Sequence, residues 1–196
     1  MTPEMQVAIV GVIGTVGGTV IGTVLGWVLN NLSQRGKLNC YVVEWKDEFE
    51  YNNNKGIMSP STSKEQTQVY SYSFSIDVYN SSSSTKIMRG IEVVFAKGKE
   101  ELRVDIPLDD STKRASQYHT TYDAVAPINI PPKAVIKISL HNYFWNSEHN
   151  LDFMWNADKV YLRYIDENNK KQKLLLHTEQ YSNHFNQTTE EKKENE

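Results

Sequence analysis

The stretch 141–158, HNYFWNSEHNLDFMWNAD, gathers the side chains of this sequence that are best suited to chemistry. Imidazole and carboxylate groups together can bind a divalent metal such as Zn²⁺. The eight-residue gap between His141 and His149 fixes no ligand geometry, so we predict no metal site and no cofactor. We interpret the stretch as a connection whose aromatic side chains cap the end of a β-domain. The alternative is a small-ligand pocket lined by His141, Trp145, His149 and Trp155.

Motifs for nucleophilic or phosphate chemistry are absent from the sequence. It contains no G-x-S-x-G turn and no G-x-x-x-x-G-K-[ST] loop. Its single cysteine, Cys40, falls in a predicted strand, where a packed side chain is the simpler interpretation than a nucleophile. We therefore predict a protein that is not an enzyme and that has no catalytic residues.

Composition narrows the class of partner. The chain has 196 residues and a formal net charge of −3, with an isoelectric point near 6.0. A nucleic-acid-binding protein would show a basic surface, so nucleic acid is not an expected partner. The part after residue 37 is rich in Tyr, Val, Ile, Ser and Asn, which is typical of strands and turns.

Alternating side chains predict the strands that would position any site. In 69–80, aromatic and aliphatic residues alternate with Ser71, Ser73, Ser75 and Asp77, as in a strand with one solvated face. Similar alternation predicts further strands, joined by turns at 80–86, 97–100 and 166–171. The strands expected from this pattern are 38–45, 69–80, 87–96 (with Ile87, Ile91, Val93 and Phe95 on one side), 102–108, 134–140, 160–164 and 174–176.

Seven or eight short strands without a convincing helix after residue 37 predict an all-β domain. An antiparallel β-sandwich is favoured, and a small β-barrel is the alternative. The strand–NSS–strand stretch at 80–82 and INIPPKAVIKISL at 128–140 resemble immunoglobulin-like sandwich domains, in which a proline-containing corner precedes a strand. The Cys and Trp hallmarks of antibody domains are missing, so the resemblance concerns architecture.

The N-terminal segment from Met5 to Leu29 contains 25 residues and no charged side chain. About 20 apolar residues in a helix span a bilayer core, so we predict one transmembrane helix ahead of the β-domain. A cleaved signal peptide is less consistent with this segment, because it lacks a basic start and a small-x-small cleavage site. The predicted organisation is a helix and juxtamembrane segment at 1–37, a β-domain at 38–178 and a disordered polar tail at 179–196.

Four glycines of this segment recur every fourth residue and therefore share one helix face: Gly14, Gly18, Gly22 and Gly26. Small residues at this spacing allow two membrane helices to approach closely. We predict self-association of the helix through this face, giving a homo-oligomer in the membrane. A passive lipid anchor is the alternative.

The residues that flank the segment predict its orientation. Trp27 is expected at the membrane interface, and Arg35 and Lys37 follow on the C-terminal side. Because Lys and Arg are enriched on the cytoplasmic side of a membrane, we predict a single-pass protein of the cell membrane with a cytoplasmic β-domain.

Three functions fit this organisation. The first is a membrane-anchored binding or adaptor protein whose β-domain binds an unknown protein or small molecule. The second is an effector that perturbs the membrane; in the order of its elements the chain is similar to bacterial anti-phage effectors that join N-terminal membrane helices to a small β-barrel sensing cyclic nucleotides. The third is an anchored domain that faces the outside of the cell.

Overall fold

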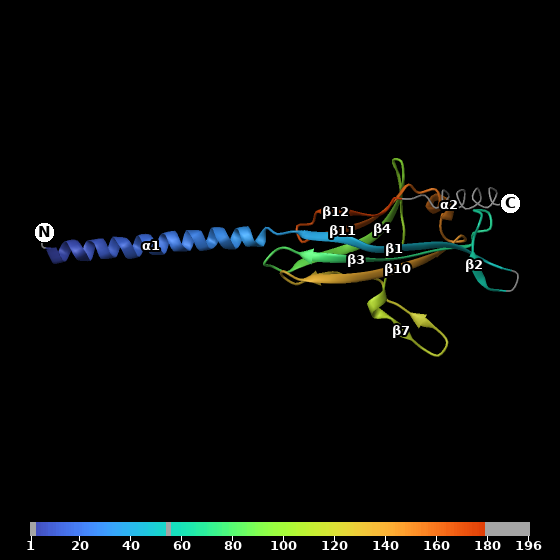
Figure 1. Ribbon diagram of the computed structural model, residues 1–196, viewed down its shortest axis with the longest axis horizontal. Coiled ribbons are helices and arrows are strands. Elements are labelled where there is room, and N and C mark those ends of the chain that lie inside the picture. Colours follow the sequence, from blue (N-terminus) through green and yellow to red (C-terminus); the bar gives the residue numbers. More distant parts are fainter. Residues whose placement is uncertain (1–2, 54–55, 179–196) are drawn as a thin grey trace, which may run out of the picture.

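The computed structural model describes residues 3–53 and 56–178. The tail predicted at 179–196 lies outside these residues. One long helix, α1 (Pro3–Gln34), projects from one end of a domain built mainly of strands (Figure 1). The longer strands are β1 (Leu38–Asn52), β3 (Val69–Asn80), β4 (Lys86–Lys97), β10 (Val135–Trp145), β11 (Lys159–Ile165) and β12 (Lys171–His177).

Short elements complete the domain. They are β2 (Met58–Pro60), β5 (Glu100–Arg103), β6 (Leu108–Asp109), a 3₁₀ turn η1 (Asp110–Thr112), β7 (Arg114–Ala115), β8 (Thr120–Thr121), β9 (Ile128–Ile130) and the helix α2 (Leu151–Trp155). The strand predicted at 102–108 is therefore divided, because β5 ends at Arg103 and β6 begins at Leu108. The helix α2 interrupts the stretch that the sequence predicts as an open connection.

Two antiparallel sheets form a sandwich, as predicted, rather than a closed barrel. One sheet has the strand order β2-β1-β3-β10-β6, and the other has the order β12-β11-β4-β5 with β9 also paired to β4. β7 and β8 form a separate hairpin that projects from the sandwich (Figure 1). Every strand pair within the described residues is antiparallel, as in immunoglobulin-like domains.

The core lies between the sheets and is aromatic at its centre. The predicted alternation of β3 is confirmed, since Tyr70, Tyr72 and Phe74 are buried while Ser71 and Ser73 are partly exposed. Trp45 of β1 stacks on Tyr72 and Phe74, with ring centroids 5.4 and 6.0 Å apart. Such aromatic pairs each contribute about 0.5–1.5 kcal/mol beyond the area they bury.

One side-chain assignment in β4 is wrong. Ile87 was expected on the inner side with Ile91, but Met88 is fully buried there and Ile87 is only partly buried. Gly90 has φ +56° and lies where the register with β11 shifts. This irregularity adds a residue to β4 and reverses which side chains face the core before it.

α1 contains the segment for which the sequence predicts a membrane span; within the part of the chain that the structure describes, no helix is both long enough and apolar enough to cross a membrane. No residue of α1 whose side chain the structure describes belongs to the buried core cluster of the domain. Its described apolar side chains are instead exposed, among them Val20 (56%), Leu25 (55%) and Leu29 (64%).

Candidate functional site

A network of hydrogen bonds holds the junction between α1 and the β-domain. A serine-rich loop, 81–85, connects β3 to β4 and fastens the end of the helix. The Ser83 N–H donates to the Ser33 carbonyl at 3.1 Å, and the Ser81 N–H donates to the Lys37 carbonyl at 3.2 Å. The Ser81 hydroxyl accepts from the Lys37 N–H and donates to the Lys37 carbonyl. These bonds fix the direction in which α1 leaves the domain.

Gly36 is required at this junction because the backbone of the serine-rich loop passes close to its Cα atom. A Cβ atom at position 36 would lie 2.5 Å from the Ser81 carbonyl carbon and from the Ser82 Cα. Both are backbone atoms, so the loop itself would have to move. The glycine lets the linker and the serine loop pack in direct contact.

Asn80 organises the loops around the junction. Its side chain is fully buried, and its Nδ2 donates to the carbonyls of Ser84, Ile130 and Pro131. Its Oδ1 accepts from the backbone N–H and the hydroxyl of Ser82. One amide therefore joins the β3–β4 loop to the turn before β10. Lys133, in that turn, donates from its N–H to the Ser82 carbonyl and from Nζ to the Ser81 carbonyl.

A cleft of about 420 Å³ opens beside the junction. The last turn of α1 and the linker form one wall, with Gln34, Arg35 and Lys37, and the β11–β12 turn forms the other, with Asp166 and Glu167. This volume is within the range of about 300–1,000 Å³ typical of small-ligand sites. Its lining is largely polar and charged, unlike the apolar lining of most such sites.

The two carboxylates of the cleft already have partners. Glu167 forms an ion pair with the buried Lys86. Burial acts to raise the pKa of Asp166, but hydrogen bonds from the Lys170 N–H, the Gln172 side chain and the Asn168 N–H lower it, and the net pKa is below its usual value. Arg35 and Lys37 are exposed and have no ion-pair partner among the described residues. Arg35 and Lys37 are therefore the charged side chains of the cleft that are available to an external ligand.

The four residues of the predicted ligand pocket are separated in the structure. His141 contacts Asp110 through Nδ1 and lies against the edge of the Tyr122 ring. His149 contacts Asp105 at 3.2 Å and packs on Phe144. Among the described clefts, His141 lines one and Trp155 another.

The two tryptophans differ in environment. Trp155 is only 8% exposed and packs against Phe49, so its ring belongs to the core. Trp145, at the end of β10, is 44% exposed. The burial of Trp155 supports the interpretation that aromatic side chains of the stretch cap the domain. Among the described residues, no group of three or more potential metal ligands occurs.

The glycine face predicted on α1 is open. A Cβ added at Gly14, Gly18, Gly22 or Gly26 would meet no atom within 4 Å. The hydroxyls of Thr15, Thr19 and Thr23 donate to the carbonyls four residues earlier, at 2.8–2.9 Å. Their donors are thus satisfied within the helix, which suits an apolar environment. Trp27 is 67% exposed.

Cys40 has no reactive environment. It is partly buried, and burial raises the pKa of its thiol while a contact with the Tyr164 hydroxyl at 3.6 Å lowers it to a smaller extent. A thiol with a raised pKa is mainly protonated at neutral pH and is a poor nucleophile. The contact joins β1 to β11, across the sandwich.

Sequence reasoning missed most of the junction. It identified Arg35 and Lys37 as flanking charges and 80–86 as a turn, but not the contacts among Asn80, Gly36 and the turn at 131–134. The partners of Asn80 are up to 51 residues away, so no local pattern indicates them. The only local signal is the run of Asn and Ser, which favours turns stabilised by side chains.

Comparison with known proteins identifies the family of the domain. The chain is 25% identical over 147 residues to the SPbeta prophage-derived uncharacterized protein YopI of Bacillus subtilis (strain 168), covering 74% of this chain and 81% of that protein. Among solved structures, the ApaA protein from Bordetella pertussis matches with a TM-score of 0.34 and 9% identity, covering 72% of this chain and 89% of that one. The Iho670 flagellar-like filament matches with a TM-score of 0.33 and 10% identity, covering 89% and 98%.

The structural scores are too low to support an argument about function, and none of these comparisons supports the likeness to anti-phage effectors. The match to a family model, in contrast, covers most of the chain. The model of the YopI Ig-like domain family matches residues 36–177, from the junction glycine to the last residue of β12. The chain belongs to the YopI Ig-like domain family.

Proposed function

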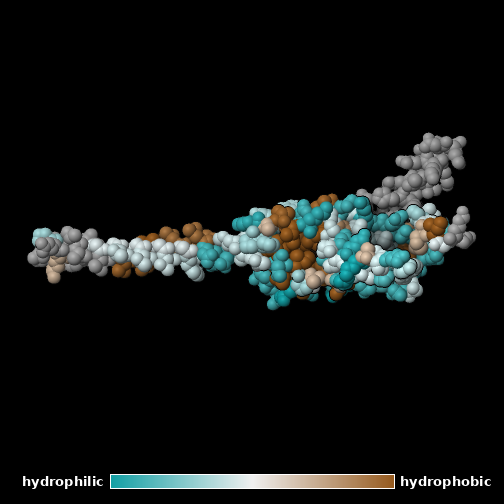
Figure 2. Space-filling view, turned by 90° about the horizontal axis from the view of Figure 1, so that it is seen from below, coloured by the Kyte–Doolittle hydropathy of each residue, from teal (hydrophilic) through white to brown (hydrophobic). Residues whose placement is uncertain are grey.

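We propose that the protein is a single-pass membrane-anchored binding protein that presents its Ig-like domain at the bilayer surface. The observation that carries the proposal is the exposure of the apolar side chains of α1, which the domain does not cover (Figure 2). Soluble proteins rarely expose large apolar patches without a partner or a membrane to cover them. The domain itself also has an apolar patch near the end that carries α1 (Figure 2).

The charge pattern of the N-terminal segment supports the same function. Residues 5–29 contain no Asp, Glu, Lys or Arg. The statement that no helix is apolar enough to cross a membrane concerns the described residues. Residues 5–29 include several side chains that the structure does not describe. Arg35 and Lys37 support a cytoplasmic position for the domain, because Lys and Arg are enriched on that side of a membrane.

The anchor is tested by extracting the full chain from membranes at alkaline pH. We expect the protein to remain with the membrane, and the variant Val20→Lys/Leu25→Lys to be released. A lysine at the centre of a spanning helix costs about 2.5–3.5 kcal/mol, and one at position 25, nearer the end of the segment, costs less. The matched control, Leu32→Lys/Gln34→Lys, adds the same charge beyond the segment and should stay bound. Release of the unchanged protein would overturn the proposal.

We propose further that α1 associates with copies of itself through Gly14, Gly18, Gly22 and Gly26. The open space above these glycines supports this, since a second helix can approach the backbone there. Several copies would then display several Ig-like domains side by side. Two or more weak sites on one assembly bind a multivalent partner more strongly than a single site does.

A further inference from the structure

We propose that the end of the Ig-like domain that carries α1 is a binding surface for anionic lipid headgroups. We call this end the basic end and define it by 31–38, 80–89, 130–135 and 165–172. The inference rests on the proposed membrane anchor, and it adds a lipid class and a second contact between protein and bilayer. It requires the domain to lie against the membrane rather than to move freely on its linker.

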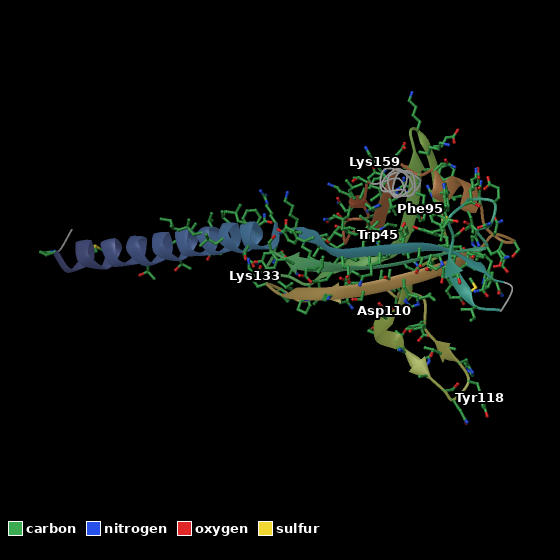
Figure 3. The ribbon with its side chains drawn as sticks, turned by 45° about the vertical axis from the view of Figure 1, so that its right-hand side comes forward. Trp45, Phe95, Asp110, Tyr118, Lys133 and Lys159 are labelled. Carbon is green, nitrogen blue, oxygen red and sulfur yellow. The ribbon has the colours of Figure 1, made fainter. Side chains whose placement is uncertain are left out.

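The first step is the position of the four segments. The serine loop is bonded to Ser33 and Lys37, and Lys133 is bonded to the serine loop. The β11–β12 turn faces α1 across the cleft. All four segments therefore lie around the point where α1 leaves the domain, and Figure 3 shows Lys133 there.

The second step is the charge of this end. Its four segments contain seven basic and two acidic residues, in a chain whose formal net charge is −3. The basic residues are Arg35, Lys37, Lys86, Arg89, Lys133, Lys170 and Lys171, and the acidic ones are Asp166 and Glu167. Positive charge is concentrated at one end of a molecule that is acidic elsewhere.

The third step is which of these charges face solvent. Lys86 is buried and paired with Glu167, and Arg89 bonds to Asn169. The other five basic side chains belong to exposed residues and form no ion pair within the described residues. The hydrogen bonds that Asp166 accepts, from two backbone N–H groups of its turn and from Gln172 of β12, hold its carboxylate beside the turn.

The fourth step is the distance to the bilayer. Arg35 follows Leu29 by six residues, which places it about 9 Å further along a helix. The headgroup region on each side of a bilayer is roughly 5–8 Å thick. If the apolar segment ends at Leu29, the backbone of Arg35 and Lys37 lies at or just beyond the outer edge of the headgroups, and their long side chains reach back to the lipid phosphates. The Ser81 and Ser83 hydrogen bonds then bring Lys133 and the serine loop towards the same surface.

Charge complementarity selects anionic lipid over other occupants. Basic residues close to an anionic membrane surface bind it by electrostatic attraction, which falls off within a Debye length of roughly 8 Å. A nucleic acid would also match the charge, but the approach of a duplex to this end is blocked on one side by α1 and its bilayer. We therefore commit to the headgroups of the membrane that holds α1.

The test measures energy transfer between the domain and the lipid surface for the full chain. The donor dye is attached to Thr85→Cys, an exposed position in the serine loop, in a Cys40→Ser background. The acceptor is a headgroup-labelled lipid in vesicles of phosphatidylcholine alone, or of phosphatidylcholine and phosphatidylglycerol at roughly 3:1. We expect transfer to rise at least about twofold in the anionic vesicles and to fall back near 1 M NaCl, where the Debye length is about 3 Å.

Two charge-reversal variants are compared. Lys133→Glu/Lys170→Glu/Lys171→Glu should lose the increase, while the matched control Lys97→Glu/Lys99→Glu/Lys159→Glu, which changes exposed lysines away from the basic end, should keep it. Lys133 also bonds to the serine loop, so Lys170→Glu/Lys171→Glu is included as a variant that leaves that bond in place. It should lose part of the increase.

The outcomes separate the two proposals. Binding to the vesicles is measured separately, by flotation of the protein with them. Flotation with both vesicle types, together with equal energy transfer in both, would overturn the headgroup surface alone. Recruitment only to anionic vesicles, abolished by the triple reversal, would overturn the anchor and support the surface. No flotation with either vesicle type would overturn both. Equally strong binding of duplex DNA, lost in the same triple variant, would overturn lipid as the occupant.

Discussion

At the scale of single residues, the junction depends on two positions where only one residue type fits. At position 36 there is no room for a side chain. At position 80 the side chain must both donate and accept hydrogen bonds. Neither touches the aromatic core, yet both hold together segments that are far apart in the chain. Their substitution tests whether the junction is as rigid as its contacts indicate.

Gly36→Ala should destabilise the full chain because its Cβ would meet the backbone of Ser81 and Ser82. Overpacking of this kind costs about 1–3 kcal/mol, with loss of the bonds between the serine loop and α1. The measurement is the midpoint of thermal unfolding in detergent. Gly17→Ala is the control, since a Cβ there meets nothing within 4 Å. Equal midpoints for the two variants would show that the loop moves aside freely.

Asn80→Asp should destabilise the domain more than Asn80→Ala. The alanine variant removes one donor from three carbonyls, of which the Ser84 carbonyl still accepts from the Ser82 hydroxyl, at a cost of about 1–3 kcal/mol. The aspartate variant also places an acceptor against those carbonyls and buries a charge. The measurement is the free energy of unfolding in urea at neutral pH. The opposite order of the two variants would mean that the site holds water or opens to solvent.

At the scale of elements, the sequence predicted the strands that have one solvated face and missed the elements that tertiary contacts create. The alternation in β3 and β10 indicated their inner faces correctly, because burial of one face imposes a period of two. The bulge at Gly90 changes which side chains of β4 face the core before it, and a single glycine in a sequence does not predict a bulge. The helix α2, with five residues, is too short to show a helical period.

The candidate site was less predictable than the fold for the same reason. The cleft is made from the end of α1, the linker and a turn more than 120 residues later. The sequence indicates the charges of each segment, but only the strand order brings the segments together. The stretch 141–158, which looked most like a site, is divided because β10 continues to Trp145 and α2 turns Trp155 into the core.

The β11–β12 turn should lose stability as pH falls. Asp166 accepts three hydrogen bonds, and its pKa is below the usual value. A lowered pKa stabilises the fold above the pKa of the unfolded state, about 3.9, and this contribution is lost as pH falls through the folded value. Asp166→Asn should therefore lower the free energy of unfolding in urea slightly at pH 7, by less than about 1 kcal/mol for a partly exposed group. At pH 3 the difference should shrink; a constant difference would contradict the assignment.

The helix α1 should change its oligomeric state when its glycine face is filled. Gly18→Ile/Gly22→Ile places two branched side chains in the open space above the glycines, so a second helix can no longer approach. We expect a shift towards the monomer by cross-linking or sedimentation in detergent. Val20→Ile/Val24→Ile enlarges side chains at two neighbouring positions without filling the groove and should leave the oligomer intact. Unchanged assembly in both variants would refute the glycine interface.

At the scale of the whole molecule, the polar and apolar surfaces are arranged along one axis. The helix with its exposed apolar side chains is followed by the basic end of the domain (Figure 1), and the rest of the chain carries more acidic than basic residues. This order matches the order of layers met on leaving a bilayer, from hydrocarbon to anionic headgroups to water. The Ig-like domain would then expose its far end, including α2 and the β2 region, to partners.

Among the side chains that the structure describes, none from α1 lies in the core, so we expect the domain to fold without the helix. We expect residues 36–178, which keep Gly36 and the Lys37–Ser81 bonds, to be monomeric by sedimentation. Their unfolding midpoint should lie within a few degrees of that of the full chain, since a change of about 1 kcal/mol moves the midpoint of a domain this size by roughly 2–4 °C. The full chain should assemble in detergent through α1. Assembly of residues 36–178 alone would instead place the interface on the sandwich, and a large drop in their midpoint would mean that α1 stabilises the domain beyond the contacts of the junction.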